Sequence, residues 1–208
     1  DNISRLKLLT RHELETALKF KLAKRNLLVT FHPVTLEQNT SAYQIDELLA
    51  ALAELKDTGL IFTMPNADIE GRLLFRKIEA FCAKHSHACA YTSLGQLRYL
   101  SCIAHVDGVI GNSSSGLAEV PSFKKGTVNI GDRQRGRLKA ASVIDCNPTR
   151  SSIGKAVERL YSRDFQAMLS TVENPYGNGG ASEKVINTLE IRSLDGLLKK
   201  TFYDLPGS

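Results

Sequence analysis

The alternation of short apolar runs with amphipathic stretches constrains the fold of this chain more than any other feature. The apolar runs are typical of buried strands. They lie at 26–31, 59–64, 88–91, 106–110, 126–130 and 141–145. Helical periodicity separates them at 43–55, 71–84 and 94–104, and the tail after Asn147 has a mainly helical pattern. This order predicts an α/β fold, a Rossmann-like parallel sheet with helices on both faces.

Bulk composition indicates one globular unit. The 208 residues are 42% hydrophobic and 24% charged, with a net charge of +5, values that are ordinary for a folded domain. We expect residues 1–208 to form a single domain, since no linker or repeat divides them. The four cysteines form no CxxC pair, which favours free thiols in a reducing, cytoplasmic compartment. No apolar run reaches the ~20 residues of a membrane span.

The first residues suggest that the chain is part of a longer protein. It opens at Asp1-Asn2-Ile3 without a methionine. We therefore expect a fragment from which the N-terminal part has been removed.

A serine-rich turn follows the apolar run at 106–110. It reads Gly-Asn-Ser-Ser-Ser-Gly at 111–116 and leads into a helical pattern. Backbone N–H groups at a helix start, with the positive end of the helix dipole, bind anions. Glu119 lies one to two turns further on and is not needed for capping. A phosphate cradle backed by a carboxylate suggests a nucleotide, with its ribose hydroxyls on the acid.

Polar residues also follow the other predicted strands. His32 follows the first, Asn66 and Asp68 the second, and Arg133 the fifth. Because ligands of parallel sheets bind at the carboxyl ends of the strands, these residues are expected to share one edge. Arg133 can bind a phosphate through charge-assisted hydrogen bonds. The turn lacks the P-loop and GxGxxG patterns, and no Cys/His cluster predicts a metal site.

Five segments in order resemble one family. They lie at 31–35, 64–68, 111–121, 131–137 and 174–177. Together they resemble the C-terminal half of the hydrolysing UDP-N-acetylglucosamine 2-epimerases of sialic acid biosynthesis, from about residue 2 to about residue 189. The resemblance implies the second Rossmann-like domain of a glycosyltransferase-B fold, which binds UDP and uses no cofactor.

The resemblance also implies residue roles. Ser113 and Ser114 match the serines that bind the diphosphate, and Glu119 matches the ribose-binding glutamate. Arg133 matches an arginine that contacts UDP, and His32 the histidine that assists departure of the diphosphate.

Three further matches are less defined. Tyr99 falls where some relatives place an aromatic ring against uracil. Asn66 and Asp68 match a family motif on the possible substrate side, without an assigned contact. The turn cluster at 174–180 is expected to have a structural role before the last helices, which in the family cross back towards the first domain.

The family eliminates UDP from UDP-N-acetylglucosamine and hydrates the glucal to N-acetylmannosamine. Its catalytic carboxylates lie in the N-terminal domain, so this fragment is expected to bind UDP weakly and to be inactive without that partner domain. The full enzyme is expected to be a homodimer. A UDP-2,4-diacetamido sugar remains an alternative substrate.

Two readings from other classes are also open. The basic cluster at 133–139 could bind nucleic acid, but no aromatic residue lies between Arg133 and Lys139 for base stacking. A regulatory, flavodoxin-like module would need a functional site without a second domain. We expect neither nucleic acid nor membrane as a partner.

Overall fold

The computed structural model describes residues 2–34, 40–65, 69–193 and 195–196, and its core is a six-stranded parallel sheet. The strand order is β3-β2-β1-β4-β5-β6, and every pairing is parallel. The strands are β1 (Arg25–Thr30), β2 (Thr58–Thr63), β3 (Ala88–Tyr91), β4 (Gly108–Gly111), β5 (Gly126–Ile130) and β6 (Val143–Cys146). The predicted α/β class and the six predicted strands are confirmed.

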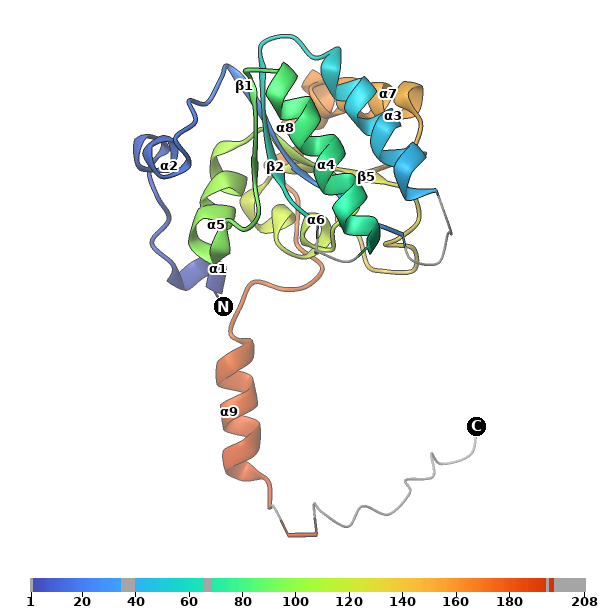
Figure 1. The fold of residues 1–208 in the computed structure, drawn as a ribbon. Coiled ribbons are helices and arrows are strands. Elements are labelled where there is room, and N and C mark those ends of the chain that lie inside the picture. Colours follow the sequence, from blue (N-terminus) through green and yellow to red (C-terminus); the bar gives the residue numbers. More distant parts are fainter. Residues whose placement is uncertain (1, 35–39, 66–68, 194, 197–208) are drawn as a thin grey trace, which may run out of the picture.

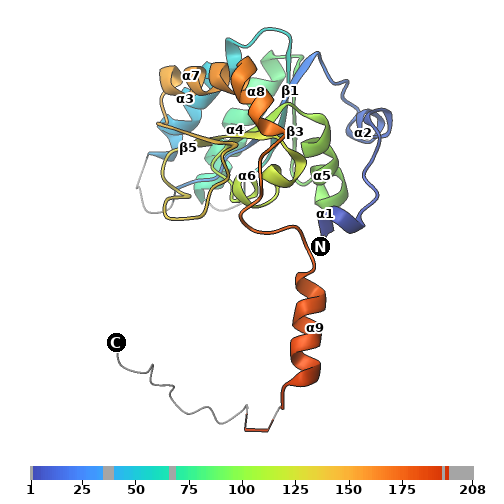
Figure 2. The same ribbon diagram turned by 180° about the vertical axis from the view of Figure 1, so that it is seen from behind.

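Helices cover both faces of this sheet (Figures 1 and 2). One layer contains α3 (Ser41–Ala53), α4 (Ile69–Lys84), α7 (Arg150–Leu160) and α8 (Arg163–Leu169), in which α3 packs against both α4 and α7, and α7 contacts α8. The other contains α2 (Arg11–Leu18), α5 (Gly95–His105), α6 (Ser115–Ala118) and the 3-10 helix η1 (Val120–Phe123). The short α1 (Asn2–Arg5) precedes α2.

Alternation along the central strands divides the apolar side chains between two cores. In β1, Leu27 and Val29 are buried against the α3–α4–α7 layer, whereas Leu28 is buried with Leu14 and Leu18 of α2. Successive side chains of a strand point to opposite faces, which explains the division. Because both faces are covered, these strands read as continuous apolar runs in the sequence.

The serine-rich turn differs from its prediction. The helix that follows it, α6, has only four residues and is continued by η1. Ser114 occupies the N-cap position, but its side chain makes no capping hydrogen bond. A four-residue helix has a weak macrodipole, since that dipole sums over aligned peptide units. The expected contribution of a helix dipole to anion binding is therefore smaller than the sequence pattern suggested.

Close backbone contacts hold the turn against the sheet. Gly111 has φ +143°, and a Cβ atom there would lie 1.9 Å from the Thr30 carbonyl oxygen. A Cβ at Gly116 would lie 2.6 Å from Thr127 Cγ2, and Thr127 Oγ1 donates to the Gly116 carbonyl at 2.7 Å. The two glycines thus allow the turn to lie directly on β1 and β5.

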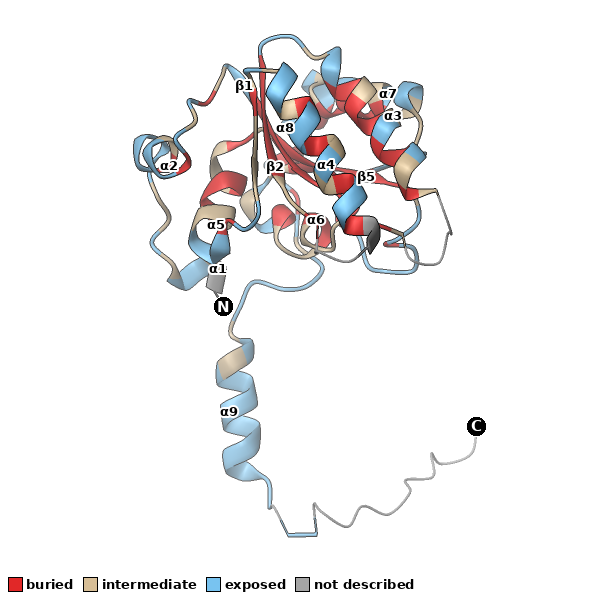
Figure 3. Ribbon diagram, in the orientation of Figure 1, coloured by how far each residue is buried: buried red, intermediate tan, exposed pale blue. Residues whose placement is uncertain are grey.

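The helix α9 (Ala181–Ile191) has no buried residue and extends away from the sheet (Figure 3). Before it, Asn174 Nδ2 donates to the Ala118 carbonyl at 2.8 Å and to Ser122 Oγ at 2.7 Å. These bonds tie the 174–180 turn to the α6–η1 segment, which agrees with the structural role expected for it. No helix in the described part of the chain is long and apolar enough to cross a membrane.

We predict that Gly116→Ala destabilises the chain by about 1–3 kcal/mol, because the new methyl group overlaps Thr127. The matched control is Gly154→Ala within α7, where an added Cβ meets nothing within 4 Å. That change is expected to stabilise the chain by about 0.5–1 kcal/mol. Urea unfolding of both variants measures the difference, and equal effects would contradict the close contact.

Candidate functional site

A hollow of about 350 Å³ lies at the carboxyl ends of β1 to β4. Its walls are rich in hydroxyl groups, and the lining includes Thr30, Thr63, Thr92, Ser93, Tyr99, Ser113 and Ser115. Two residues predicted from the sequence, Tyr99 and Ser113, therefore share one cavity. The hollow lies at the carboxyl ends of the strands, where parallel sheets bind ligands, and its hydroxyl groups stand among a mainly apolar lining.

Hydrogen bonds fix the floor and one wall of this hollow. Tyr99 Oη donates to Ser115 Oγ at 2.8 Å, and Thr63 Oγ1 donates to Thr30 Oγ1 at 2.8 Å. Burial raises the pKa of the Tyr99 phenol. Tyr99 is therefore a neutral aromatic side chain, which its hydrogen bond to Ser115 fixes beside the serine-rich turn.

His32 and Arg133 meet at Asn112 rather than in the hollow. The Asn112 side chain accepts from the His32 N–H at 2.8 Å and donates to the His32 carbonyl at 2.8 Å. The Asn112 carbonyl accepts from Arg133 Nη1 at 3.0 Å and from Gln134 Nε2 at 2.8 Å. The strand exits of β1, β4 and β5 are thus joined at one residue.

The turn itself presents free donors, and Glu119 presents a free acceptor. In the described part of the chain, the backbone N–H groups of Ser113 and Ser114 have no hydrogen-bond partner. Glu119 follows α6, and its Oε2 atom is buried without a partner. A buried acceptor without a donor costs about 1–3 kcal/mol. Glu119 is not among the residues that line the hollow, so its Oε2 atom would meet a ligand hydroxyl only after the side chain turned towards it.

Sequence reasoning passed over two residues of this edge. Asn112 and Gln134 lie inside the segments that identified the site, but neither was assigned a role. Asn112 is fully buried and Gln134 is 1% exposed. A polar side chain directly after a buried strand was the available signal for Asn112. Asn66 and Asp68 lie outside the described residues.

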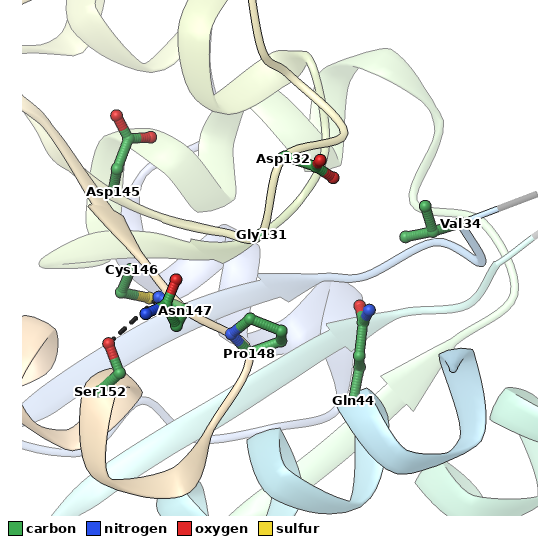
Figure 4. Close-up of a pocket in the computed structure, with 9 residues that line it drawn as sticks. All are labelled: Val34, Gln44, Gly131, Asp132, Asp145, Cys146, Asn147, Pro148 and Ser152. Atoms are coloured by element: carbon green, nitrogen blue, oxygen red, sulfur yellow. Dashed lines mark hydrogen bonds between the residues drawn. The ribbon is translucent and has the colours of Figure 1, made fainter. Parts of the chain in front are cut away.

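A second hollow, of about 460 Å³, lies between α3 and the ends of β5 and β6 (Figure 4). Asp132 and Asp145 are among its lining residues. Asp145 is already paired with Lys139 at 2.8 Å and accepts from Asn129 Nδ2 at 2.7 Å. Among the described residues, no group of three His, Cys, Asp or Glu side chains could hold a metal ion.

The cysteines offer no reactive group. Cys146 lines this second hollow, and burial raises the pKa of its thiol to about 12. Burial likewise raises the pKa of Cys82 to about 11 and of Cys89 and Cys102 to about 12. All four are free thiols.

We predict slow alkylation of these thiols in the folded chain at pH 8. Their raised pKa values leave little thiolate, which is the reactive form, and reactivity should rise only as the pH approaches 11. Iodoacetamide labelling followed by mass spectrometry measures it, with the urea-unfolded chain as the reactive control. Rapid labelling of a single cysteine at pH 8 would contradict the raised pKa of that thiol.

Comparison with known proteins places the whole described sheet in one family. Residues 1–190 match the family model described as UDP-N-acetylglucosamine 2-epimerase. A Campylobacter jejuni protein named GDP/UDP-N,N'-diacetylbacillosamine 2-epimerase (hydrolyzing) is 41% identical over 205 residues, covering 98% of this chain and 53% of that protein. The Escherichia coli polysialic acid biosynthesis protein P7 is 38% identical over 99% of this chain and 53% of its own length. The chain thus spans about half the length of these relatives.

Solved structures show the same fold. A putative UDP-N-acetylglucosamine 2-epimerase from Listeria monocytogenes matches with a TM-score of 0.68 at 15% identity, over 95% of this chain and 50% of that one. A Staphylococcus aureus MnaA–UDP structure matches with a TM-score of 0.69 at 16% identity, over 89% of this chain and 48% of that one. These matches confirm the glycosyltransferase-B-type half predicted from the sequence.

Proposed function

The chain belongs to the UDP-N-acetylglucosamine 2-epimerase family, and from this we propose that it is the UDP-binding half of a hydrolysing UDP-sugar 2-epimerase. Residues 1–208 would then form the C-terminal domain, with an N-terminal domain supplying the catalytic carboxylates. Coverage of 53% of the Campylobacter relative and 53% of the Escherichia coli relative supports this division. Cytoplasmic location and a homodimeric full enzyme stay predictions.

The unpartnered carboxylate oxygen of Glu119 is the observation that carries the proposal. It is a buried acceptor that follows the turn with the free N–H groups of Ser113 and Ser114. A nucleoside diphosphate has the complementary groups, since its phosphates accept hydrogen bonds and its ribose hydroxyls donate them. Tyr99, on the wall beside Ser113, offers a ring against the base.

In the proposed reaction, UDP leaves as an anion and the remaining glucal is hydrated. Negative charge develops on the diphosphate as its bond to the sugar breaks. Arg133 stabilises that charge electrostatically, and His32 assists as a donor or general acid. Proton removal from the sugar falls to the missing domain, so the 208-residue chain alone is expected to bind UDP without turnover. No cofactor is needed.

The sugar distinguishes two candidate substrates. UDP-N-acetylglucosamine, which would give N-acetylmannosamine, is the substrate that the family resemblance favours. A UDP-2,4-diacetamido sugar is the second candidate, supported by the name of the Campylobacter relative at 41% identity. Both share the UDP half, so the residues described above serve either substrate.

We predict that Glu119→Gln weakens UDP binding about tenfold, because a charged acceptor of the ribose hydroxyls is lost. Inorganic pyrophosphate, which has no ribose, should bind equally well to both forms. Amide chemical-shift titration of the chain measures the two affinities. Absence of UDP-induced shifts at Ser113 and Ser114 at millimolar concentration would overturn the nucleotide proposal.

Two controls sharpen this experiment. Glu158→Gln removes the same charge from an exposed position on α7 and should leave UDP affinity unchanged. The Glu119→Gln chain should not lose thermal stability, because an amide is easier to bury than an unpaired carboxylate. If the Glu119→Gln substitution lowers the affinity for 2′-deoxy-UDP as much as it lowers the affinity for UDP, Glu119 does not contact the 2′-hydroxyl.

In the full-length protein, we predict that His32→Ala lowers kcat about a hundredfold, the contribution expected of a general acid. Product formation from UDP-N-acetylglucosamine and from a UDP-2,4-diacetamido sugar should be followed separately, which also identifies the substrate. The exposed, distant His12→Ala serves as the control. Undiminished turnover of the His32 variant would remove this histidine from the mechanism.

A further inference from the structure

Asn112 joins two residues that the proposed reaction needs. We propose that Asn112 is a positioning residue, which holds His32 and Arg133 in register against the diphosphate and is itself held by Gln134. This inference rests on the proposed function. It assigns a task to two buried amides that do not contact substrate in the mechanism above.

The side chain of Asn112 extends the sheet by one residue. The β1–β4 ladder ends where Thr30 pairs with Gly111. Beyond that pair, the Asn112 N–H donates to the Thr30 carbonyl at 3.2 Å, and its side-chain amide binds both backbone polar groups of His32. This amide clasp pairs with the His32 backbone as a neighbouring strand would. The backbone of His32 is thereby fixed to the start of the serine-rich turn.

The backbone carbonyl of Asn112 holds the Arg133 guanidinium group. A carbonyl oxygen has two lone pairs, and here Arg133 and Gln134 occupy both. No ion pair with a carboxylate is found for Arg133 within the described residues. Its anchor is neutral, so its charge and remaining N–H groups are free for an anion. Desolvation by neighbouring groups and the nearby Arg137 lower the pKa of Arg133, and a bound anion would offset both effects.

Burial of an unpartnered oxygen at Gln134 costs stability, which suggests that this residue has a specific role. Its Nε2 atom donates to the Asn112 carbonyl, whereas its Oε1 atom is buried without a partner. An apolar residue would avoid that cost. What the glutamine adds, in the geometry observed, is the second hydrogen bond that fixes the Asn112 carbonyl in front of Arg133.

The chain offers a closely matched control. Asn26, which is 2% exposed, makes the same kind of clasp: its Oδ1 accepts from the Ala23 N–H at 2.9 Å and its Nδ2 donates to the Ala23 carbonyl at 3.0 Å. It lies at the start of β1, at the opposite edge of the sheet from the serine-rich turn. Loss of either clasp is expected to lower stability, but only the Asn112 clasp reaches the proposed diphosphate site.

The test is a double-mutant cycle in the 208-residue chain, with affinity for UDP and for uridine measured by calorimetry or shift titration. Asn112→Ala and Arg133→Ala are each expected to weaken UDP about tenfold and to leave uridine unchanged. Asn112→Ala keeps the backbone carbonyl to which Arg133 donates, but it removes the side-chain clasp that fixes this part of the turn to the His32 backbone. Because that carbonyl is then no longer held in place for Arg133, the double variant should lose little more than either single variant. Asn26→Ala combined with Arg133→Ala should show independent effects.

A second variant guards against loss of folding. If Asn112→Ala does not fold, Gln134→Leu removes one donor and keeps the clasp, and it should weaken UDP about threefold with uridine unchanged. Equal losses for UDP and uridine, or losses that multiply in the cycle, would overturn the positioning role alone. If the unaltered chain binds no UDP, the proposed function is wrong and this inference falls with it.

Discussion

The close approach of β4 to β1 at their carboxyl ends is the constraint on which the candidate site depends. Gly111 has no Cβ, and any larger residue there would collide with the Thr30 carbonyl. That approach brings Asn112 within reach of the His32 backbone. The serine-rich turn and the histidine are consequently placed by one contact between two adjacent strands, and the arginine, which follows β5, joins them through its hydrogen bond to the Asn112 backbone carbonyl.

The candidate site contains buried polar atoms that have no hydrogen-bond partner. Where an edge of the sheet has no function, such atoms are usually paired or replaced by apolar groups. Oxygens of Glu119 and Gln134 are buried without partners. Elsewhere in the described chain, buried amides of comparable exposure are paired, as Asn26 is with Ala23 and Asn129 with Asp145. Unpartnered buried polar atoms also occur at His87, Ser142 and Tyr161. What distinguishes Glu119 and Gln134 is therefore their position at the strand-exit edge, where a ligand can supply the missing partner.

Local patterns predicted the elements well where one physical rule dominated. Helical periodicity over 43–55 predicts one apolar face that contains Ile45, Leu48, Leu49, Leu52 and Leu55. The first four are buried, whereas Leu55 lies beyond the end of α3 and is only partly buried. The pattern was less informative after the serine-rich turn, where a longer helix was expected and a single turn plus a 3-10 turn is observed. There, packing of Gly116 on Thr127 and the proline at 121 govern the chain more than helix propensity.

The sequence by itself determined the α/β class, the parallel sheet and the edge at which polar residues gather, because periodicity and strand order are local properties of the chain. It also indicated His32, Ser113, Ser114, Glu119 and Arg133 as candidates. Only the tertiary structure decided which of them meet. The bonds from Asn112 to residues 80 positions before it and 21–22 after it arise from strand order and close packing, which no local pattern records.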